Sequence, residues 1–98
     1  MDELNRTNQT RNEANETAIQ SAIAEATGQA YRNWALAHPS LAGVIDRAVL
    51  TERTAQSLRN SPEYKQAIAG FHESKNEMNL LNQLMNLAGP ALQMVLGI

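Results

Sequence analysis

The chain has no cysteine, only four aromatic residues and no run of basic residues. Without cysteine it can form neither a disulfide framework nor a thiol-based site. Its eight Lys and Arg are scattered among ten Asp and Glu, and the net charge is −2. That balance gives no field that would attract a phosphate backbone, so we expect no specific nucleic-acid binding.

The first residues, Met-Asp-Glu-Leu-Asn-Arg, lack the basic and apolar regions of a cleaved signal peptide. The expected site of synthesis is therefore the cytoplasm. A virion or a cell envelope remains open as the final location.

Motifs for catalysis or metal binding are also lacking. His72-Glu73 begins like the zinc-binding HExxH motif, but position 76 is Asn. His38 is the only other histidine, and we interpret both as surface residues. Glu73 and Glu77 are four residues apart and are interpreted as solvated charges. We predict a protein that is not an enzyme, with no catalytic residue, no cofactor and no metal.

The material for a hydrophobic core is limited. Of the 98 residues, 43% are hydrophobic, but 15 residues are Ala and only 20 are Leu, Ile, Val or Phe. Small domains bury only part of their surface, and association with other chains is a common remedy. Residues 1–17 form a polar, Asn/Thr-rich arm whose three N-x-T triplets, at Asn5, Asn8 and Asn15, we interpret as chance. Residues 18–98 are predicted to form a single helical domain.

Apolar spacing of three and four residues predicts an all-α fold of three helices, at about 3–37, 40–60 and 62–88, followed by a short apolar segment. Trp34 should anchor the core at the end of the first helix. His38-Pro39 should end that helix, and Ser40 should cap the second. The triplet Ser61-Pro62-Glu63 is a typical start for the third, and Gly89-Pro90 should stop it. The apolar face of the second helix comprises Leu41, Val44, Ile45, Ala48, Val49, Ala55 and Leu58.

The third predicted helix carries the most informative pattern, because the 21 residues after Glu77 contain no charge. A heptad seam runs along it, and it is flanked by a second apolar stripe and by a stripe of amides at Asn76, Asn79, Gln83 and Asn86. Two apolar faces imply neighbours on two sides. Most seam residues and the second stripe form the predicted interface: Ala67, Phe71, Met78, Leu81, Met85, Ala88, Leu80, Leu84 and Leu87.

We expect a non-enzymatic structural subunit that assembles with itself and with other subunits. Three alternatives stay open: a membrane-active oligomer that uses residues 78–98, a core closed within one chain, and a monomeric adaptor or inhibitor of one protein. Ser61-Pro62 and the roughly forty residues after it resemble the small helical subunits of secretion rods and needles. The composition is similar to that of small virion proteins ejected with phage DNA. Both resemblances imply a subunit of a rod, channel or virion, and neither assigns a residue.

Overall fold

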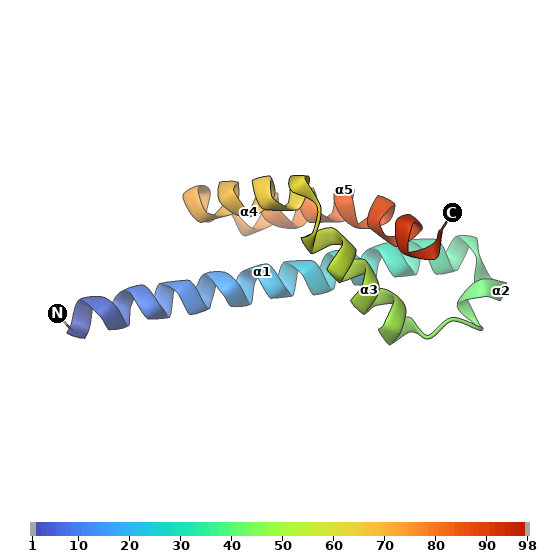
Figure 1. Ribbon diagram of the computed structural model, residues 1–98, viewed down its shortest axis with the longest axis horizontal. Coiled ribbons are helices and arrows are strands. Elements are labelled where there is room, and N and C mark those ends of the chain that lie inside the picture. The colour runs from blue at the N-terminus through green and yellow to red at the C-terminus, as the bar shows by residue number, and fades with distance from the viewer. Residues whose placement is uncertain (1, 98) are drawn as a thin grey trace.

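A computed structural model describes residues 2–97, and the side chains of residues 15–97. The described residues form five helices and no strand: α1 (Asp2–Ala37), α2 (Pro39–Ala42), α3 (Arg47–Arg59), α4 (Pro62–Ser74) and α5 (Glu77–Leu96) (Figure 1). The all-α class is confirmed, whereas the count of three helices is wrong.

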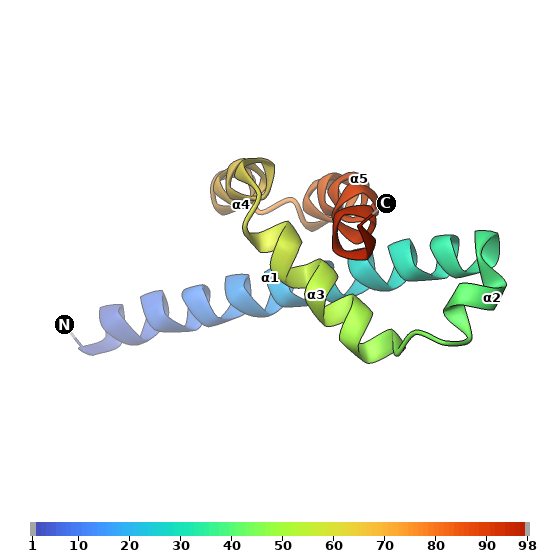
Figure 2. The ribbon, with the colours of Figure 1, turned by 45° about the vertical axis from the view of Figure 1, so that its right-hand side comes forward.

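The long helix α1 forms the base of the molecule, which measures 57 × 21 × 20 Å. Helix α5 lies along the C-terminal part of α1 and runs in the same direction (Figure 1). Helix α4 runs back beside α5, and α3 crosses α1 and contacts α5 (Figure 2). Helix α5 therefore touches α1, α3 and α4 and is the centre of the fold.

Helix α1 ends where the sequence predicts, because Pro39 disfavours the helical conformation at His38. The helix is continuous across residue 17, where the polar arm was predicted to end, although the side chains of residues 1–14 lie outside the described residues. Its buried face begins at Ala22 and ends at Trp34. The Thr27 hydroxyl in this face donates to the Ile23 carbonyl at 2.9 Å, which satisfies a buried polar group within the helix.

The prediction of one helix over 40–60, capped by Ser40, is wrong. Helix α2 ends after one turn at Ala42, and Gly43 to Ile45 are not helical. Asp46 then caps α3, and its carboxylate accepts from the backbone N–H groups of Ala48 at 2.9 Å and Val49 at 3.3 Å. A short acidic side chain that binds backbone N–H groups in this way favours a helix start over a helix interior.

The predicted start of the next helix at Ser61 is confirmed. The Ser61 hydroxyl accepts from the Tyr64 N–H at 3.2 Å, and Pro62 occupies the first helical position. The prediction that this helix reaches residue 88 is wrong, because α4 ends at Ser74. Lys75 has a left-handed conformation (φ 57°), and the Asn76 side chain accepts from the Asn79 N–H at 3.0 Å. The heptad seam is therefore divided between two helices.

The predicted stop at Gly89-Pro90 is also wrong, since α5 continues to Leu96 with Pro90 in its interior. The clash that normally excludes helix before a proline involves the Cβ of the preceding residue, and Gly89 has none. Pro90 itself is exposed, whereas the next two residues, Ala91 and Leu92, are buried. Burial of these two residues offsets the hydrogen bond that the proline removes.

Two groups of buried side chains form the core. The larger group joins α1, α3, α4 and α5 around Ile23, Leu58, Phe71 and Leu84. The smaller group consists of Trp34, Leu50 and Leu92, and so joins α1, α3 and α5. The predicted role of Trp34 as a core anchor is confirmed, because only 7% of its surface is exposed.

Candidate functional site

The titratable side chains do not converge into a reaction centre. Within the described part of the chain, no group of three or more His, Asp or Glu is placed to hold a metal ion. His38 stacks on Trp34, with ring centroids 5.7 Å apart, whereas His72 lies on α4 against Phe71. Burial raises the pKa of the Tyr64 phenol, and nearby Arg59 opposes this shift. A tyrosine phenol is already protonated at neutral pH, and this upward shift moves Tyr64 further from acting as a general base.

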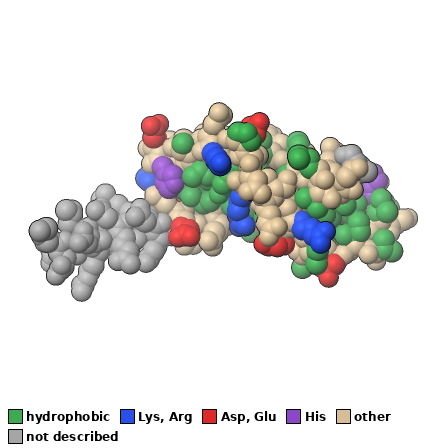
Figure 3. Space-filling view, viewed as in Figure 1, with side chains coloured by type: hydrophobic (Ala, Val, Ile, Leu, Met, Phe, Trp, Pro, Cys, Tyr) green, Lys and Arg blue, Asp and Glu red, His purple; other side chains and the backbone are tan. Residues whose placement is uncertain are grey.

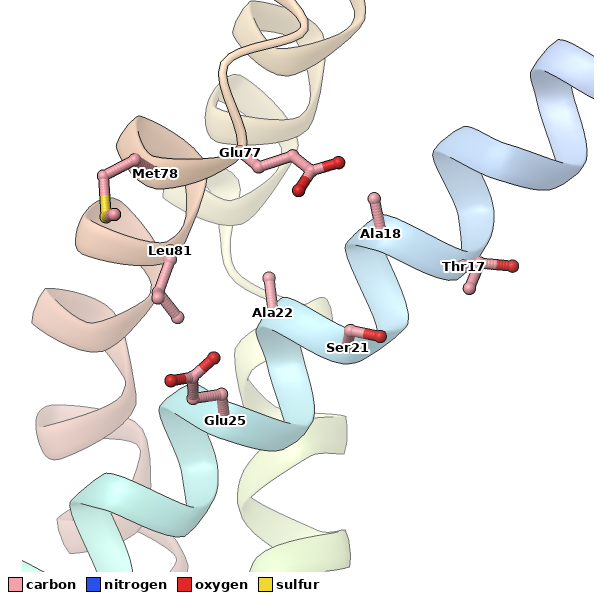
Figure 4. Close-up of a pocket in the computed structure, with 8 residues that line it drawn as sticks. All are labelled: Thr17, Ala18, Ser21, Ala22, Glu25, Glu77, Met78 and Leu81. Atoms are coloured by element: carbon pink, nitrogen blue, oxygen red, sulfur yellow. The ribbon is translucent and has the colours of Figure 1, made fainter.

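The main concave feature is a groove between α1 and α5, which we call the α1/α5 groove. It consists of two cavities in sequence along the same pair of helices. The first has a volume of about 580 Å³ and is lined by residues 17–25 of α1 and 77–81 of α5 (Figure 4). The second has a volume of about 300 Å³ and is lined by residues 26–38 and 85–93. Its walls are mostly apolar, from Ala18, Ala22, Ala26, Ala30, Trp34, Met78, Leu81, Met85, Gly89 and Leu92.

The polar side chains of the groove differ between the two cavities. Glu25 and Glu77 lie at the first cavity, one from each helix, and extend toward the space between the helices (Figure 4). The second cavity carries no acid and is edged by Gln29, Asn33, Gln93 and His38. No Lys or Arg is among the described residues that line either cavity. The groove therefore has an acidic half and an amide half.

The nine residues of the predicted interface fall into two sets. Five are buried in the core of the chain itself: Ala67, Phe71, Leu80, Leu84 and Ala88. Leu81 and Leu87 are half-buried, whereas Met78 is 67% exposed and Met85 is 38% exposed. Met78, Leu81 and Met85 lie together along the α1/α5 groove. The break at Lys75 separates these three from the earlier seam residues Ala67 and Phe71, which lie on α4.

Trp34 has an unusual environment for a tryptophan. Its ring lines the amide half of the groove and packs on His38, and its indole Nε1 is buried without a hydrogen-bond partner. A buried donor that has lost water and gained no acceptor costs about 1–3 kcal/mol. The buried apolar surface of the ring therefore stabilises the core, whereas the unpaired N–H lowers this stabilisation.

Sequence reasoning missed a second exposed apolar surface, which we call the apolar end. It lies at the end of the molecule that carries α2 and the C-terminal turn of α5, where Figure 3 shows a gathering of hydrophobic side chains. Val44 is 80% exposed, and Leu41 and Val49 are each about half exposed. These residues were predicted to lie on the apolar face of a single helix over 40–60. The break between Gly43 and Asp46 exposes Leu41, Val44 and Val49. Gly43 and Asp46 are both turn-forming residues, and they were the available sequence signal for this break.

The exposed side of α5 beyond Glu77 carries several amides and no charge. Three residues of the predicted amide stripe, Asn79, Gln83 and Asn86, are exposed there, and Asn76 is used as the cap. In the part of the chain that the structure describes, no helix combines the length and hydrophobicity needed to cross a bilayer. Compared with protein-family models, curated proteins and solved structures, the chain matches none of them.

Proposed function

We propose that this protein is a non-enzymatic structural subunit that self-associates through the α1/α5 groove, within a larger assembly of the rod, channel or virion type. The observation that carries the proposal is an apolar stripe, exposed at Met78 and Met85 and half-buried at Leu81, beside the small alanine side chains of α1. Exposed, flexible methionines above a floor of small residues are typical of surfaces that pack against another protein.

Two further observations support association. No Lys or Arg lines the described groove, so no long basic side chain covers its apolar walls. The apolar end offers a second surface, formed by α2, the start of α3 and the C-terminal turn of α5. A subunit with two separate apolar surfaces can continue beyond a closed pair into a larger assembly.

The experiment is a comparison of solution masses by light scattering coupled to size exclusion. We expect the full chain to exceed its monomer mass of 10.8 kDa. Met85→Asp should return it to the monomer, because the contact would bury an unpaired carboxylate. Circular dichroism should show helix content close to that of the unchanged chain, since Met85 lies outside the buried core.

Met94→Asp is the matched control. Met94 belongs to the same helix and is 75% exposed, but nine residues at 100° per residue place it on the side opposite Met85. We expect this variant to keep the mass of the unchanged chain. A chain that stays at 10.8 kDa at every concentration, or an unchanged mass for Met85→Asp, would contradict the proposal.

A second candidate is the monomeric adaptor, and one observation favours it. The buried face of α5 is fully covered by helices of the same chain, so the fold does not depend on a second copy. The groove would then receive a helix of another protein. A stable monomer that captures one defined protein, and loses that capture on Met85→Asp, would support this function over self-assembly.

A further inference from the structure

The two halves of the α1/α5 groove are complementary to each other in hydrogen bonding. Ionised Glu25 and Glu77 can only accept hydrogen bonds, and both lie in the acidic half. The amides of Asn33 and Gln93 can donate, and both lie in the amide half. A surface whose two ends are complementary can pair with a second copy of itself that is turned end for end.

The shape of the groove has the same property. In the acidic half, Met78 projects from α5 with 67% of its surface exposed. In the amide half, Gly89 presents no side chain, and a Cβ placed on it would meet no atom within 4 Å. The open cavity beside Gly89, of about 300 Å³, is large enough for a methionine side chain. The Met78 side chain of one copy can therefore enter the cavity in the amide half of another copy.

We propose that the occupant of the α1/α5 groove is the same groove of a second copy, in antiparallel orientation, with a two-fold axis at Met85. This inference rests on the self-association proposed above and specifies its geometry. Counting equal steps from Met85 along α5 places Glu77 opposite the second copy's Gln93 and Met78 opposite its Leu92, which lines the same cavity as Gly89. On α1, the same rotation brings Glu25 to the second copy's Asn33. A parallel arrangement would instead bring four carboxylates together, and like charges at short distance repel.

The available area fits a small specific interface. The groove follows α1 from residue 18 to residue 37, which is about 30 Å at 1.5 Å per residue. The molecule is 20 to 21 Å across in its two shorter directions. The shared surface is therefore about 600 Å² per copy, which is the lower end of the range for specific protein interfaces.

Engineered cysteines test this geometry, since the chain has no thiol of its own. Met85→Cys places the thiols of two copies next to the axis, so mild oxidation of the full chain should give a disulfide dimer on a denaturing gel. Met94→Cys is the matched control on the opposite side of α5, and it should stay monomeric on the same gel. Efficient linking of Met94→Cys together with none of Met85→Cys would overturn the inference.

A mixed pair tests the orientation. Met78→Cys and Gln93→Cys should cross-link with each other when the two proteins are mixed, and neither should link efficiently alone. Linking of Met78→Cys to itself would indicate a parallel arrangement and would overturn the inference. The fluorescence of Trp34, the single tryptophan, gives a readout without any substitution, because it lines the groove and should change on dilution to the monomer.

The two proposals fail in different ways. If light scattering finds the unchanged chain monomeric at every concentration, self-association fails and this geometry fails with it. If the chain associates but the cysteines do not link as described, self-association stands and only the antiparallel groove contact is wrong. Association that survives Met85→Asp but is lost on Val44→Asp would assign the contact to the apolar end instead.

Discussion

Trp34 combines two opposing contributions to stability in one side chain. Its ring is 7% exposed and joins α1 to α3 and α5 through Leu50 and Leu92. Its indole N–H is buried with no acceptor. Position 34 therefore requires a large aromatic ring, and nothing in the described structure requires the polar atom of that ring.

This difference predicts unequal effects of two substitutions. Trp34→Ala should lower the free energy of unfolding by about 3–5 kcal/mol, because it leaves a large cavity. Trp34→Phe should lower it by less than about 1.5 kcal/mol, since the lost ring area is partly offset by removal of the unpaired donor. Urea unfolding followed by circular dichroism measures both. Equal losses for the two variants would mean that the N–H has an acceptor or that the indole shape itself is required.

At the scale of the element, the sequence predicts helices better than it predicts their interruptions. The end of α1 and the start of α4 follow from strong local signals, at His38-Pro39 and at Ser61-Pro62. The breaks at Asp46 and Asn76 were missed because Asp and Asn also occur within helices. Their side-chain bonds to backbone N–H groups identify them as caps. The missed continuation through Pro90 depends on burial of Leu92, which is a tertiary effect.

Only one wall of the α1/α5 groove was predictable from the sequence. The spacing of Met78, Leu81 and Met85 identifies the α5 wall of the groove from sequence alone. The α1 wall could not be foreseen, because the pairing of α1 with α5 depends on where α4 turns back. That turn is set by Lys75 and Asn76, whose conformations the sequence pattern did not indicate.

The junction between α4 and α5 yields a prediction about capping. Asn76→Ala should lower the free energy of unfolding by about 1 kcal/mol, because the Asn79 N–H loses its acceptor. Asn79→Ala is the control, since the Asn79 side chain is exposed and its replacement should change stability by less than about 0.5 kcal/mol. Thermal or urea unfolding of the two variants provides the comparison. An equal effect at both positions would argue against a capping role for Asn76.

Pro90 yields a second prediction for the same helix. Pro90→Ala should raise the free energy of unfolding by about 1–2 kcal/mol, because it restores a helical N–H donor at an exposed position. Part of the gain is lost, since alanine leaves the unfolded chain more freedom than proline does. Pro62→Ala is the matched control, because the first residue of a helix has no carbonyl partner for its N–H. Loss of stability in Pro90→Ala would show that the proline is favourable where it stands.

At the scale of the whole molecule, the fold covers the inner face of α5 and leaves its flank open. Leu80, Leu84 and Ala88 are almost fully buried by α1, α3 and α4. Much of the apolar surface of the uncharged C-terminal segment is therefore buried within one chain. Met78 and Met85 remain uncovered beside α1. The sequence feature that suggested assembly therefore divides into a part that closes the monomer and a part that is free for a second chain.

That division predicts that stability depends on protein concentration. If two native chains form a dimer, unfolding must also separate them. Each tenfold rise in protein concentration therefore adds about 1.4 kcal/mol to the free energy of unfolding per dimer, or about 0.7 kcal/mol per chain. For a chain of 98 residues, this corresponds to a rise in Tm of roughly 3–5 °C. Met85→Asp should unfold at one Tm across the same concentrations, because this variant keeps its core but no longer binds a second chain. Thermal unfolding of both proteins by circular dichroism in cells of different path length measures the two slopes. A flat Tm for the unchanged chain would show that α5 needs no neighbour beyond α1, α3 and α4.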